Sequence, residues 1–290
     1  MNEQLQIVEC PRDAWQGLPA AIPSEVKAAY LRKLIEAGFT HIDAVSFVSP
    51  AAVPQMADAE RVLEILQPPE QVEIIGIVVN EKGAERALRT GVVRTIGFPY
   101  SVSPQFLHRN QHQTPEEALA ALKAIGARAN GDGLRVVAYL SMAFGNPYGD
   151  KWSAAAVTEA CGQLIDSGVR QISLADTVGV ASPEQIVEIV SVAIAAHREI
   201  EFGVHLHARR GEAGERIRAA YRAGCRRFDS AIGGLGGCPF AQDTLVGNIP
   251  TETLVAVLKE EGVAVPGLGA LDELIAASAK IAQSCGAPVQ

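Results

Sequence analysis

Residues 167–185 read SGVRQISLADTVGVASPEQ, and this stretch carries the start and stop signals of one β-strand between two helices. Gly168 follows a helical pattern that opens at Ser153, in the place of a left-handed C-cap. The run 170–175 is short and apolar, which is typical of a buried parallel strand. Residues 182–184, Ser-Pro-Glu, then provide an N-cap, a first-turn proline and an acid near the positive helix end. The stretch predicts a helix–strand–helix unit.

Similar units occur from one end of the chain to the other. Seven further short apolar runs predict strands, at 5–9, 41–47, 72–79, 93–98, 134–141, 201–206 and 227–232. Helical patterns separate them, with starts at Ser24 and Thr114 and glycine C-caps at Gly38, Gly91 and Gly224. Eight βα units in series predict a closed (β/α)8 barrel, a TIM barrel, with a doubly wound sheet as the alternative. We expect one domain over 1–290, in which 251–290 form a C-terminal helical extension.

Composition excludes several classes of protein. The 290 residues are 48% hydrophobic, enough for a large core, and the net charge is −8 without any block of basic residues. This balance argues against nucleic-acid and anionic-membrane partners. The chain contains no apolar run of membrane-spanning length, and its first residues do not resemble a signal peptide, so we expect a cytoplasmic protein. Five cysteines without a CxxC pair argue against a disulfide framework or a zinc ribbon.

Polar residues follow several predicted strands, where the active sites of barrel enzymes lie. His205 and His207 have the period-two spacing that turns both side chains to one face of a strand, so they could chelate a metal ion. The alternative is a pair of ordinary histidines at a strand end. Asp13 follows the first strand and Asn248 the eighth, and either could add an oxygen ligand. The alternative role for Asp13 is a helix or loop cap.

Three further residues suggest chemistry beyond metal binding. Arg12 could stabilise an enolate oxygen if it is buried, or form a surface ion pair of little energetic value. Asp176 follows the sixth strand and is either a site residue or an ordinary turn residue. Cys238 follows four glycines within 233–237, a loop that could move over the site, and the alternative is a structural thiol.

These motifs together resemble the 3-hydroxy-3-methylglutaryl-CoA lyase family of metal-dependent barrel enzymes. The resemblance covers nearly the whole chain. It rests on IVECPRD at 7–13, SFVSP at 46–50, VPQMAD at 53–58, SLADTVGV at 173–180, VHLH at 204–207, GGLGGCPFAQ at 233–242 and GNIPTE at 247–252.

The resemblance implies roles for individual residues. It implies metal ligands Asp13, His205, His207 and Asn248, and catalytic roles for Arg12, Asp43, Asp176, His205 and Cys238. The implied reaction is a retro-Claisen cleavage to acetyl-CoA and acetoacetate, as in leucine degradation and ketone body metabolism. The mixed oxygen and imidazole ligands suit Mg²⁺ or Mn²⁺, with Zn²⁺ left open. We expect an acyl-CoA substrate and a homodimer or higher homo-oligomer.

Departures from the family pattern cluster around the expected site and spare the four ligands. Ala14 and Trp15 stand inside the family motif R-D-G-x-Q, and Trp15 is expected to add bulk near the metal. Pro104 replaces an acid, Ala208 stands where an acid usually follows the second histidine, and Asp43 replaces glutamate. We therefore expect retained chemistry with an altered pocket. The alternatives are a related aldolase or condensing synthase for another hydroxy acid, and a non-catalytic metal-binding barrel.

Overall fold

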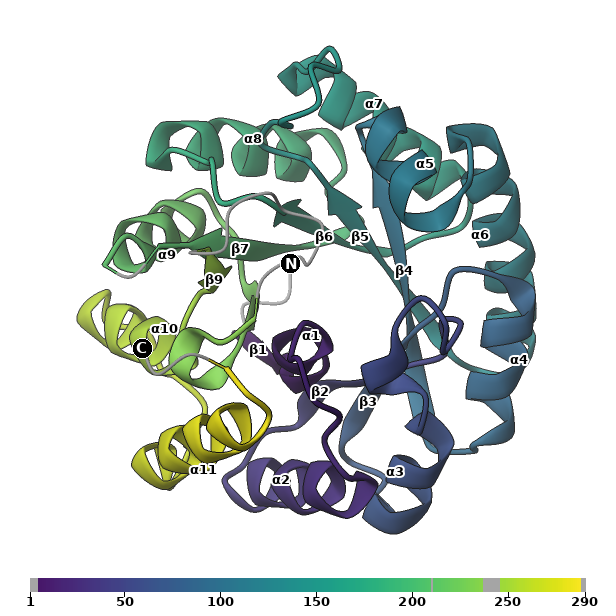
Figure 1. Cartoon of the computed structure of the whole chain (residues 1–290). Helices are drawn as coiled ribbons and strands as arrows, with labels where there is room; N and C mark the ends of the chain where they lie inside the picture. Colours follow the sequence, from purple (N-terminus) through teal and green to yellow (C-terminus); the bar gives the residue numbers. More distant parts are fainter. Residues whose placement is uncertain (1–4, 210, 237–245, 288–290) are drawn as a thin grey trace.

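Eight parallel strands close into a barrel in the computed structural model, which describes residues 5–209, 211–236 and 246–287 (Figure 1). Neighbours pair in chain order from β1 to β8, and β8 pairs with β1 to close the ring. The predicted TIM barrel is confirmed. The strands are β1 Gln6–Glu9, β2 His41–Ser46, β3 Glu73–Ile77, β4 Val93–Ser101, β5 Arg135–Ser141, β6 Gln171–Asp176, β7 Glu201–Ala208 and β8 Arg227–Ser230.

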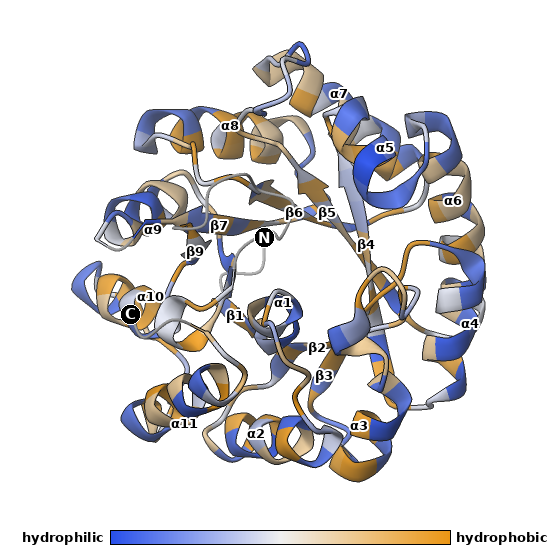
Figure 2. Cartoon of the chain, viewed as in Figure 1, coloured by the Kyte–Doolittle hydropathy of each residue, from blue (hydrophilic) through white to orange (hydrophobic). Residues whose placement is uncertain are grey.

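Helices surround the barrel and turn their apolar faces inward (Figure 2). The described residues form α1 Pro11–Gln16, α2 Ser24–Glu36, α3 Ala59–Leu66, α4 Glu81–Arg89, α5 Pro104–Gln111, α6 Pro115–Gly131, α7 Ala154–Asp166, α8 Pro183–Ala196, α9 Ala213–Arg222, α10 Thr251–Glu260 and α11 Leu271–Ser284. The expected C-terminal helices are therefore present as α10 and α11, and α11 contacts α2. Within the described part of the chain, no helix combines the length and apolar character needed to cross a membrane.

The local signals at helix ends act largely as predicted. Thr114 and Ser182 each cap a helix in a reciprocal capping box, and Ser153 accepts a hydrogen bond from the backbone of Ala156. Gly168 has a φ of +95°, which a residue with a Cβ adopts only with strain. Ser24 is the first residue of its helix, and the N-cap position belongs to the preceding proline.

Two strand boundaries differ from prediction in ways that shape the site. The seventh strand runs two residues further than expected, to Ala208, so both histidines lie within it. The eighth strand stops at Ser230 rather than at 232, because the chain turns into a short 3-10 segment, Ile232–Gly234, where Gly233 has a φ of +74°. A two-residue strand that the pattern did not predict, β9 Gly247–Asn248, pairs antiparallel with β7.

The inside of the barrel contains a small apolar cluster and a polar cluster. Alternate residues of β1, β3 and β5 form the apolar cluster Val8, Cys10, Ile75, Ile77, Val137 and Tyr139. In the polar cluster, Asp229 of β8 contacts Ser173 of β6 and His205 of β7. The two histidines of β7 thus lie on a rigid wall of strands, where side-chain positions are well defined.

Glu9 ties the end of β1 to the segments that follow β8. Its carboxyl group accepts a hydrogen bond from the backbone N–H of Ile232, at 2.8 Å, and shares one with the hydroxyl of Thr251, at 2.6 Å. The side chain is 1% exposed. Burial raises the pKa of Glu9 to about 8 from an ordinary value of 4.5. Glu9 is therefore protonated in the folded protein at neutral pH.

The raised pKa predicts that the protein loses stability as pH rises. Between about pH 4.5 and 8 the unfolded chain releases the Glu9 proton while the folded chain keeps it, so the free energy of unfolding falls with pH and levels off above 8. The full loss is at most about 5 kcal/mol, at about 1.4 kcal/mol per pKa unit. Glu9→Gln retains the shape without the titration, so its thermal midpoint should vary less across this range. An unchanged pH profile in Glu9→Gln would contradict the assignment.

Candidate metal centre

The first turn of α1 carries Arg12 and Asp13 across the C-terminal mouth of the barrel. The segment was expected as a strand end and loop, but it forms a six-residue helix because Pro11 takes the first helical position. Both charged residues are buried, at 8% and 7% exposure. Arg12 is therefore not a surface ion-pair residue, which removes the weaker of its two interpretations.

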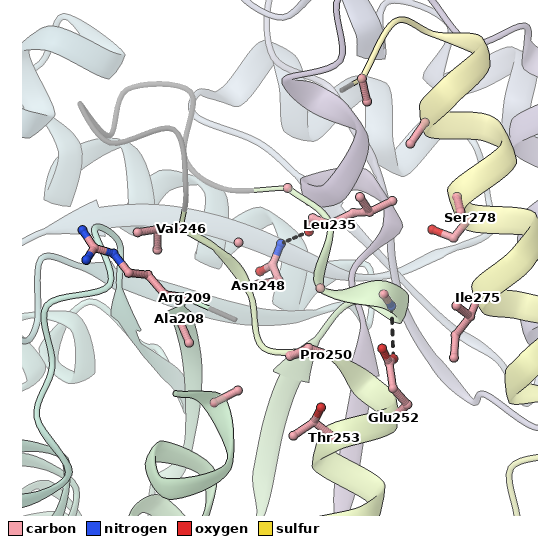
Figure 3. A pocket seen from close by; sticks show the side chains of 18 of the residues that line it. Ala208, Arg209, Leu235, Val246, Asn248, Pro250, Glu252, Thr253, Ile275 and Ser278 are labelled. Atoms are coloured by element: carbon pink, nitrogen blue, oxygen red, sulfur yellow. Dashed lines mark hydrogen bonds between the residues drawn. The ribbon is translucent and has the colours of Figure 1, made fainter. Parts of the chain in front are cut away.

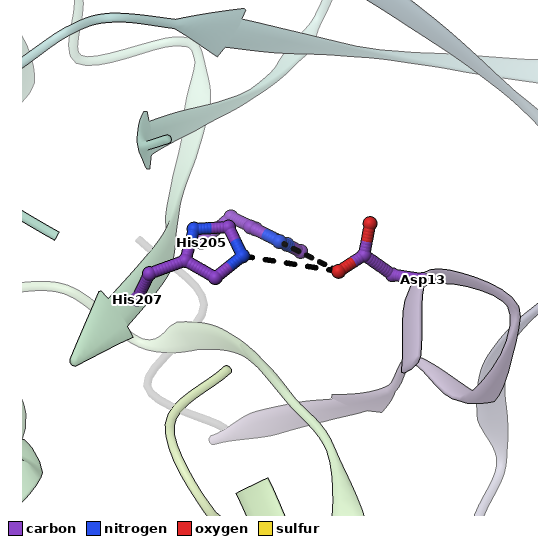
Figure 4. Close-up of side chains that lie close together, drawn as sticks. All are labelled: Asp13, His205 and His207. Carbon is purple, nitrogen blue, oxygen red and sulfur yellow. Dashed lines mark ion pairs between the residues drawn. The ribbon is translucent and has the colours of Figure 1, made fainter. Parts of the chain in front are cut away.

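Asp13 faces the two histidines of β7 (Figure 4). Its Oδ2 lies 3.8 Å from His205 Nε2 and 3.8 Å from His207 Nε2. One ligand atom from each residue lies within 4.8 Å of the others, and all three residues are buried. The period-two spacing therefore has the predicted effect: both rings turn to the same side, and a carboxylate from the opposite end of the chain meets them.

The histidine rings are oriented by their second nitrogens. His207 Nδ1 lies 2.9 Å from the backbone oxygen of Asp176, which can only accept, so Nδ1 donates and Nε2 keeps its lone pair. His207 Nε2 has no hydrogen-bond partner among the described residues. His205 Nδ1 lies 3.4 Å from Asp229 Oδ2. Both Nε2 atoms thus turn toward Asp13.

Asn248 reaches the cluster through β9. Antiparallel pairing sets Asn248 opposite His207, and its Nδ2 donates to Asp13 Oδ2 at 2.8 Å and to the backbone oxygen of Leu235 at 2.9 Å. Its Oδ1 is buried and has no partner within the described ranges. A buried acceptor without a partner costs about 1–3 kcal/mol. Rotation of the amide by half a turn would direct this oxygen, in place of Nδ2, toward Asp13 and a bound cation. The four predicted ligands are therefore neighbours.

Electrostatics keep Asp13 ionised. Burial by itself would raise the pKa of Asp13, but the polar ring of His207 beside it and the charge of Arg12 outweigh burial and lower the pKa well below its usual range. A deprotonated carboxylate, two imidazole lone pairs and a carboxamide oxygen form a donor set that fits a divalent cation. The buried cluster of Asp13, His205 and His207 is thus consistent with a divalent metal site, as predicted.

Arg12 is held on two sides. Its Nε and Nη2 bind the two carboxylate oxygens of Asp43, at 3.1 and 2.5 Å, while Nη1 contacts Asp13 at 3.3 Å and Gln16 at 3.0 Å. Burial opposes the charged form, but the carboxylates of Asp43 and Asp13 prevail and raise the pKa of Arg12. Among the described residues, these contacts use four of the five N–H groups of the guanidinium. The shorter Asp43 side chain thus makes a complete fork with Arg12.

A cavity of about 170 Å³ opens directly above the cluster. It is mostly apolar, with a few polar groups from α1, α5 and the strand ends. Its lining includes Arg12, Asp13, Ser46, Phe106, Asn110, Tyr139, Thr177, His205 and His207. Trp15, which was expected to add bulk here, does not line this cavity. It is buried against Tyr30, with ring centroids 5.6 Å apart, because the helical turn directs it outward.

A larger cavity, of about 630 Å³, lies on the other side of Asn248 (Figure 3). It is bounded by the loop 233–236, the start of α10 and the side of α11, and Ala208 and Arg209 also line it. None of Asp13, His205 and His207 lines this larger cavity. The donor groups, rather than cavity volume, identify the smaller cavity as the candidate site.

Asp176 lies beside the cluster, but its carboxylate does not face the small cavity. Its two oxygens accept hydrogen bonds from the backbone N–H groups of Val180 and Ala181, and Arg216 lies 3.0 Å from Oδ2. Only its backbone oxygen, through His207, is directed toward the cluster. The turn-residue interpretation describes these contacts, and the expected catalytic role of Asp176 stays a prediction.

The structure describes the glycine-rich loop up to residue 236. Cys238 lies outside the described residues. Gly236 has its backbone so close to Ala14 that a Cβ would come within 2.6 Å of Ala14 Cα. Sequence reasoning gave no role to Asp229 or Gln16, although Gln16 donates to Asp13 at 2.8 Å. An acid in the middle of a buried strand was the available signal for Asp229.

Comparisons with known proteins agree with this geometry. The HMGL-like family model matches residues 4–281. The mitochondrial hydroxymethylglutaryl-CoA lyase of Mus musculus is 35% identical over 264 residues, covering 91% of this chain and 81% of that protein. Hydroxymethylglutaryl-CoA lyase YngG of Bacillus subtilis is 31% identical over 279 residues, covering 96% and 92%.

Solved structures of HMG-CoA lyases are also similar to this chain in three dimensions. A Bacillus subtilis HMG-CoA lyase superposes with a TM-score of 0.91 at 30% identity, covering 99% of this chain and 95% of that one. An HMG-CoA lyase from Acinetobacter baumannii, in complex with coenzyme A and 3-methylmalate, has a TM-score of 0.89 at 32% identity, covering 99% and 92%. From the family match, the identities and the buried donor cluster, we conclude that this chain belongs to the HMGL-like family and is a lyase-like enzyme.

Proposed function

We propose that this protein is a divalent-metal-dependent carbon–carbon lyase that cleaves 3-hydroxy-3-methylglutaryl-CoA, or a close 3-hydroxyacyl-CoA, to acetyl-CoA and a 3-oxo acid. The observation that carries the proposal is the meeting of Asp13, His205 and His207 in the wall of a small cavity, with Arg12 beside them and Asn248 hydrogen-bonded to Asp13. A relative crystallised with coenzyme A supports a thioester substrate.

The chain's own residues can stabilise the negative charge that develops on substrate oxygens during the reaction. A divalent cation held by the cluster would supply Lewis acidity toward the substrate's hydroxyl and carboxylate oxygens. The leaving acetyl group departs as an enolate, whose oxygen needs a fixed positive partner. Arg12 meets that need because Asp43 and Gln16 hold its guanidinium before substrate arrives.

The hydroxyl proton needs an acceptor before the carbon–carbon bond can break. His205 lines the cavity, whereas both carboxylate oxygens of Asp176 accept hydrogen bonds elsewhere. The part of His205 in this proton relay stays a prediction, because its Nε2 lone pair is also assigned to the cation. Asp176 has an indirect part, through the carbonyl that orients His207. Protonation of the enolate carbon is assigned to Cys238 on the strength of the family resemblance alone.

Two properties of the proposed enzyme are left to experiment, the identity of the metal and that of the acyl group. Carboxylate, carboxamide and imidazole donors suit Mg²⁺ or Mn²⁺. Pro104 begins α5, which also carries Phe106 and Asn110 of the cavity wall, so a change there can alter the acyl group that is accepted. Assembly into a homodimer stays a prediction.

The test is an assay of acetyl-CoA release with Mg²⁺, Mn²⁺ and Zn²⁺ against a panel of 3-hydroxyacyl-CoA thioesters. The panel contains 3-hydroxy-3-methylglutaryl-CoA, 3-hydroxyglutaryl-CoA and 3-hydroxybutyryl-CoA, so that the methyl group and the distal carboxylate are varied separately. We expect metal-dependent cleavage of the first compound. Release that is absent for every thioester and every metal would overturn the proposal, and condensation without cleavage would favour a synthase.

A further inference from the structure

Asp229 is buried directly behind His205, on the side away from the cavity. Its Oδ2 accepts a hydrogen bond from the Ser173 hydroxyl at 2.6 Å and lies 3.4 Å from His205 Nδ1. Asp229 has no exposed surface, and His205 Nδ1 is buried without a closer partner within the described part of the chain. A small rotation of the ring would close the 3.4 Å gap to an ordinary hydrogen bond.

A buried arginine forms an ion pair with Asp229. Arg227, which is 3% exposed, contacts Asp229 through Nη1 at 3.1 Å to Oδ1 and 3.4 Å to Oδ2. Gly203 makes room for it, since a Cβ there would lie 2.9 Å from Arg227 Nη1 and 3.0 Å from its Cγ. The three residues come from adjacent strands, so a rigid part of the barrel fixes the Asp229 carboxylate.

We propose that Asp229 is a positioning residue that keeps the proton of His205 on Nδ1, so that the Nε2 lone pair faces Asp13 and the cation. The inference rests on the proposed metal-dependent function and adds a residue to it. The Asp229 carboxylate, whose charge is balanced by Arg227, can only accept hydrogen bonds. A neutral imidazole that faces it must therefore place its hydrogen on Nδ1. Carboxylates behind metal-bound histidines act in this way in other proteins.

A purely structural role is the competing explanation. In that case Asp229 serves only as the counter-ion of Arg227, and His205 would keep its orientation without it. The two explanations differ when both charges are removed together. Replacing Arg227 by methionine and Asp229 by leucine leaves no unpaired buried charge but removes the acceptor behind His205.

The experiment measures the Kd of Mn²⁺ by titration calorimetry on protein stripped with EDTA. The wild type is compared with Arg227→Met and with the double variant Arg227→Met/Asp229→Leu. We expect Arg227→Met to bind Mn²⁺ within about threefold of the wild type, because Asp229 still faces His205. The double variant should bind about 10- to 100-fold more weakly, the usual effect of losing an outer-shell carboxylate. Equal affinities in the two variants would overturn the proposal.

Imidazole ¹⁵N shifts of the metal-free protein, recorded at a pH at which the His205 ring is neutral, provide a second readout that needs neither cation nor activity. Asp229→Asn tests the tautomer. Arg227 can only donate hydrogen bonds, so the new amide would turn its oxygen to Arg227 and its NH₂ group to His205 Nδ1. The His205 proton should then move from Nδ1 to Nε2. An Nδ1 proton in Asp229→Asn would contradict the inference. Failure of the wild type to bind Mn²⁺ would count against the proposed function, and the tautomer would still decide the role of Asp229.

Discussion

Asp13→Ala is expected to remove tight binding of the divalent cation and, with it, turnover. Asp13 is the central residue of the cluster, 3.8 Å from both Nε2 atoms and 2.8 Å from Asn248 Nδ2. It also supplies the only carboxylate of the buried donor group found among the described residues. Without that charge the cation would be held by neutral donors beside the positive charge of Arg12.

The size of the effect follows from what the cation contributes. Loss of several kcal/mol of transition-state stabilisation corresponds to a fall in kcat of about 10³-fold or more. The Mn²⁺ Kd should rise by at least about 100-fold. Asp132→Ala is the matched control, since this exposed residue lies at the end of α6, and it should change neither quantity. Wild-type Mn²⁺ affinity in Asp13→Ala would remove Asp13 from the ligand set.

Arg12→Met is expected to lower kcat by about 10²- to 10³-fold, the usual cost of removing a fixed donor at a developing oxyanion. In contrast to Asp13→Ala, it should leave Mn²⁺ affinity unchanged or slightly tighter, because it removes a positive charge 3.3 Å from Asp13. Turnover and metal affinity are therefore measured together, and the pattern of the two results separates enolate stabilisation from metal binding.

Arg12→Met is also expected to destabilise the fold, and a second substitution separates this effect from the loss of turnover. Removing Arg12 leaves the Asp43 carboxylate, which has no exposed surface, without its partner, at a cost of about 3–5 kcal/mol. Arg12→Met/Asp43→Leu removes both charges and should recover the thermal midpoint without recovering kcat. Recovery of turnover along with stability would show that Arg12 serves the fold alone.

Much of the candidate site could be predicted because it depends on local periodicity. His205 and His207 face the same side because a strand repeats every two residues, whatever surrounds it. Asp13 follows the first strand, and every parallel strand of a barrel ends at the same mouth. These two regularities place three donors at one rim without any knowledge of distances.

The direction of a side chain beyond its strand end could not be predicted in the same way. Asp176 and Asp13 both follow strands and were expected in one site, yet Arg216 and two backbone N–H groups bind the Asp176 carboxylate away from the cavity. Asp43 makes a fork with Arg12, and its expected catalytic role stays a prediction. Each outcome depends on a partner far along the chain.

The sequence by itself determined the eight βα units, the helix ends and the shared face of the two histidines, since all of these follow from periodicity and capping within about fifteen residues. Only the tertiary structure decided that Asn248 meets Asp13, 235 positions earlier, through a two-residue strand with no sequence signal of its own. It alone also set Asp229 and Arg227 behind His205. The contact between Asn248 and Asp13 requires the barrel to close, because closure pairs β8 with β1, whereas Asp229 and Arg227 reach His205 through the pairing of β7 with β8.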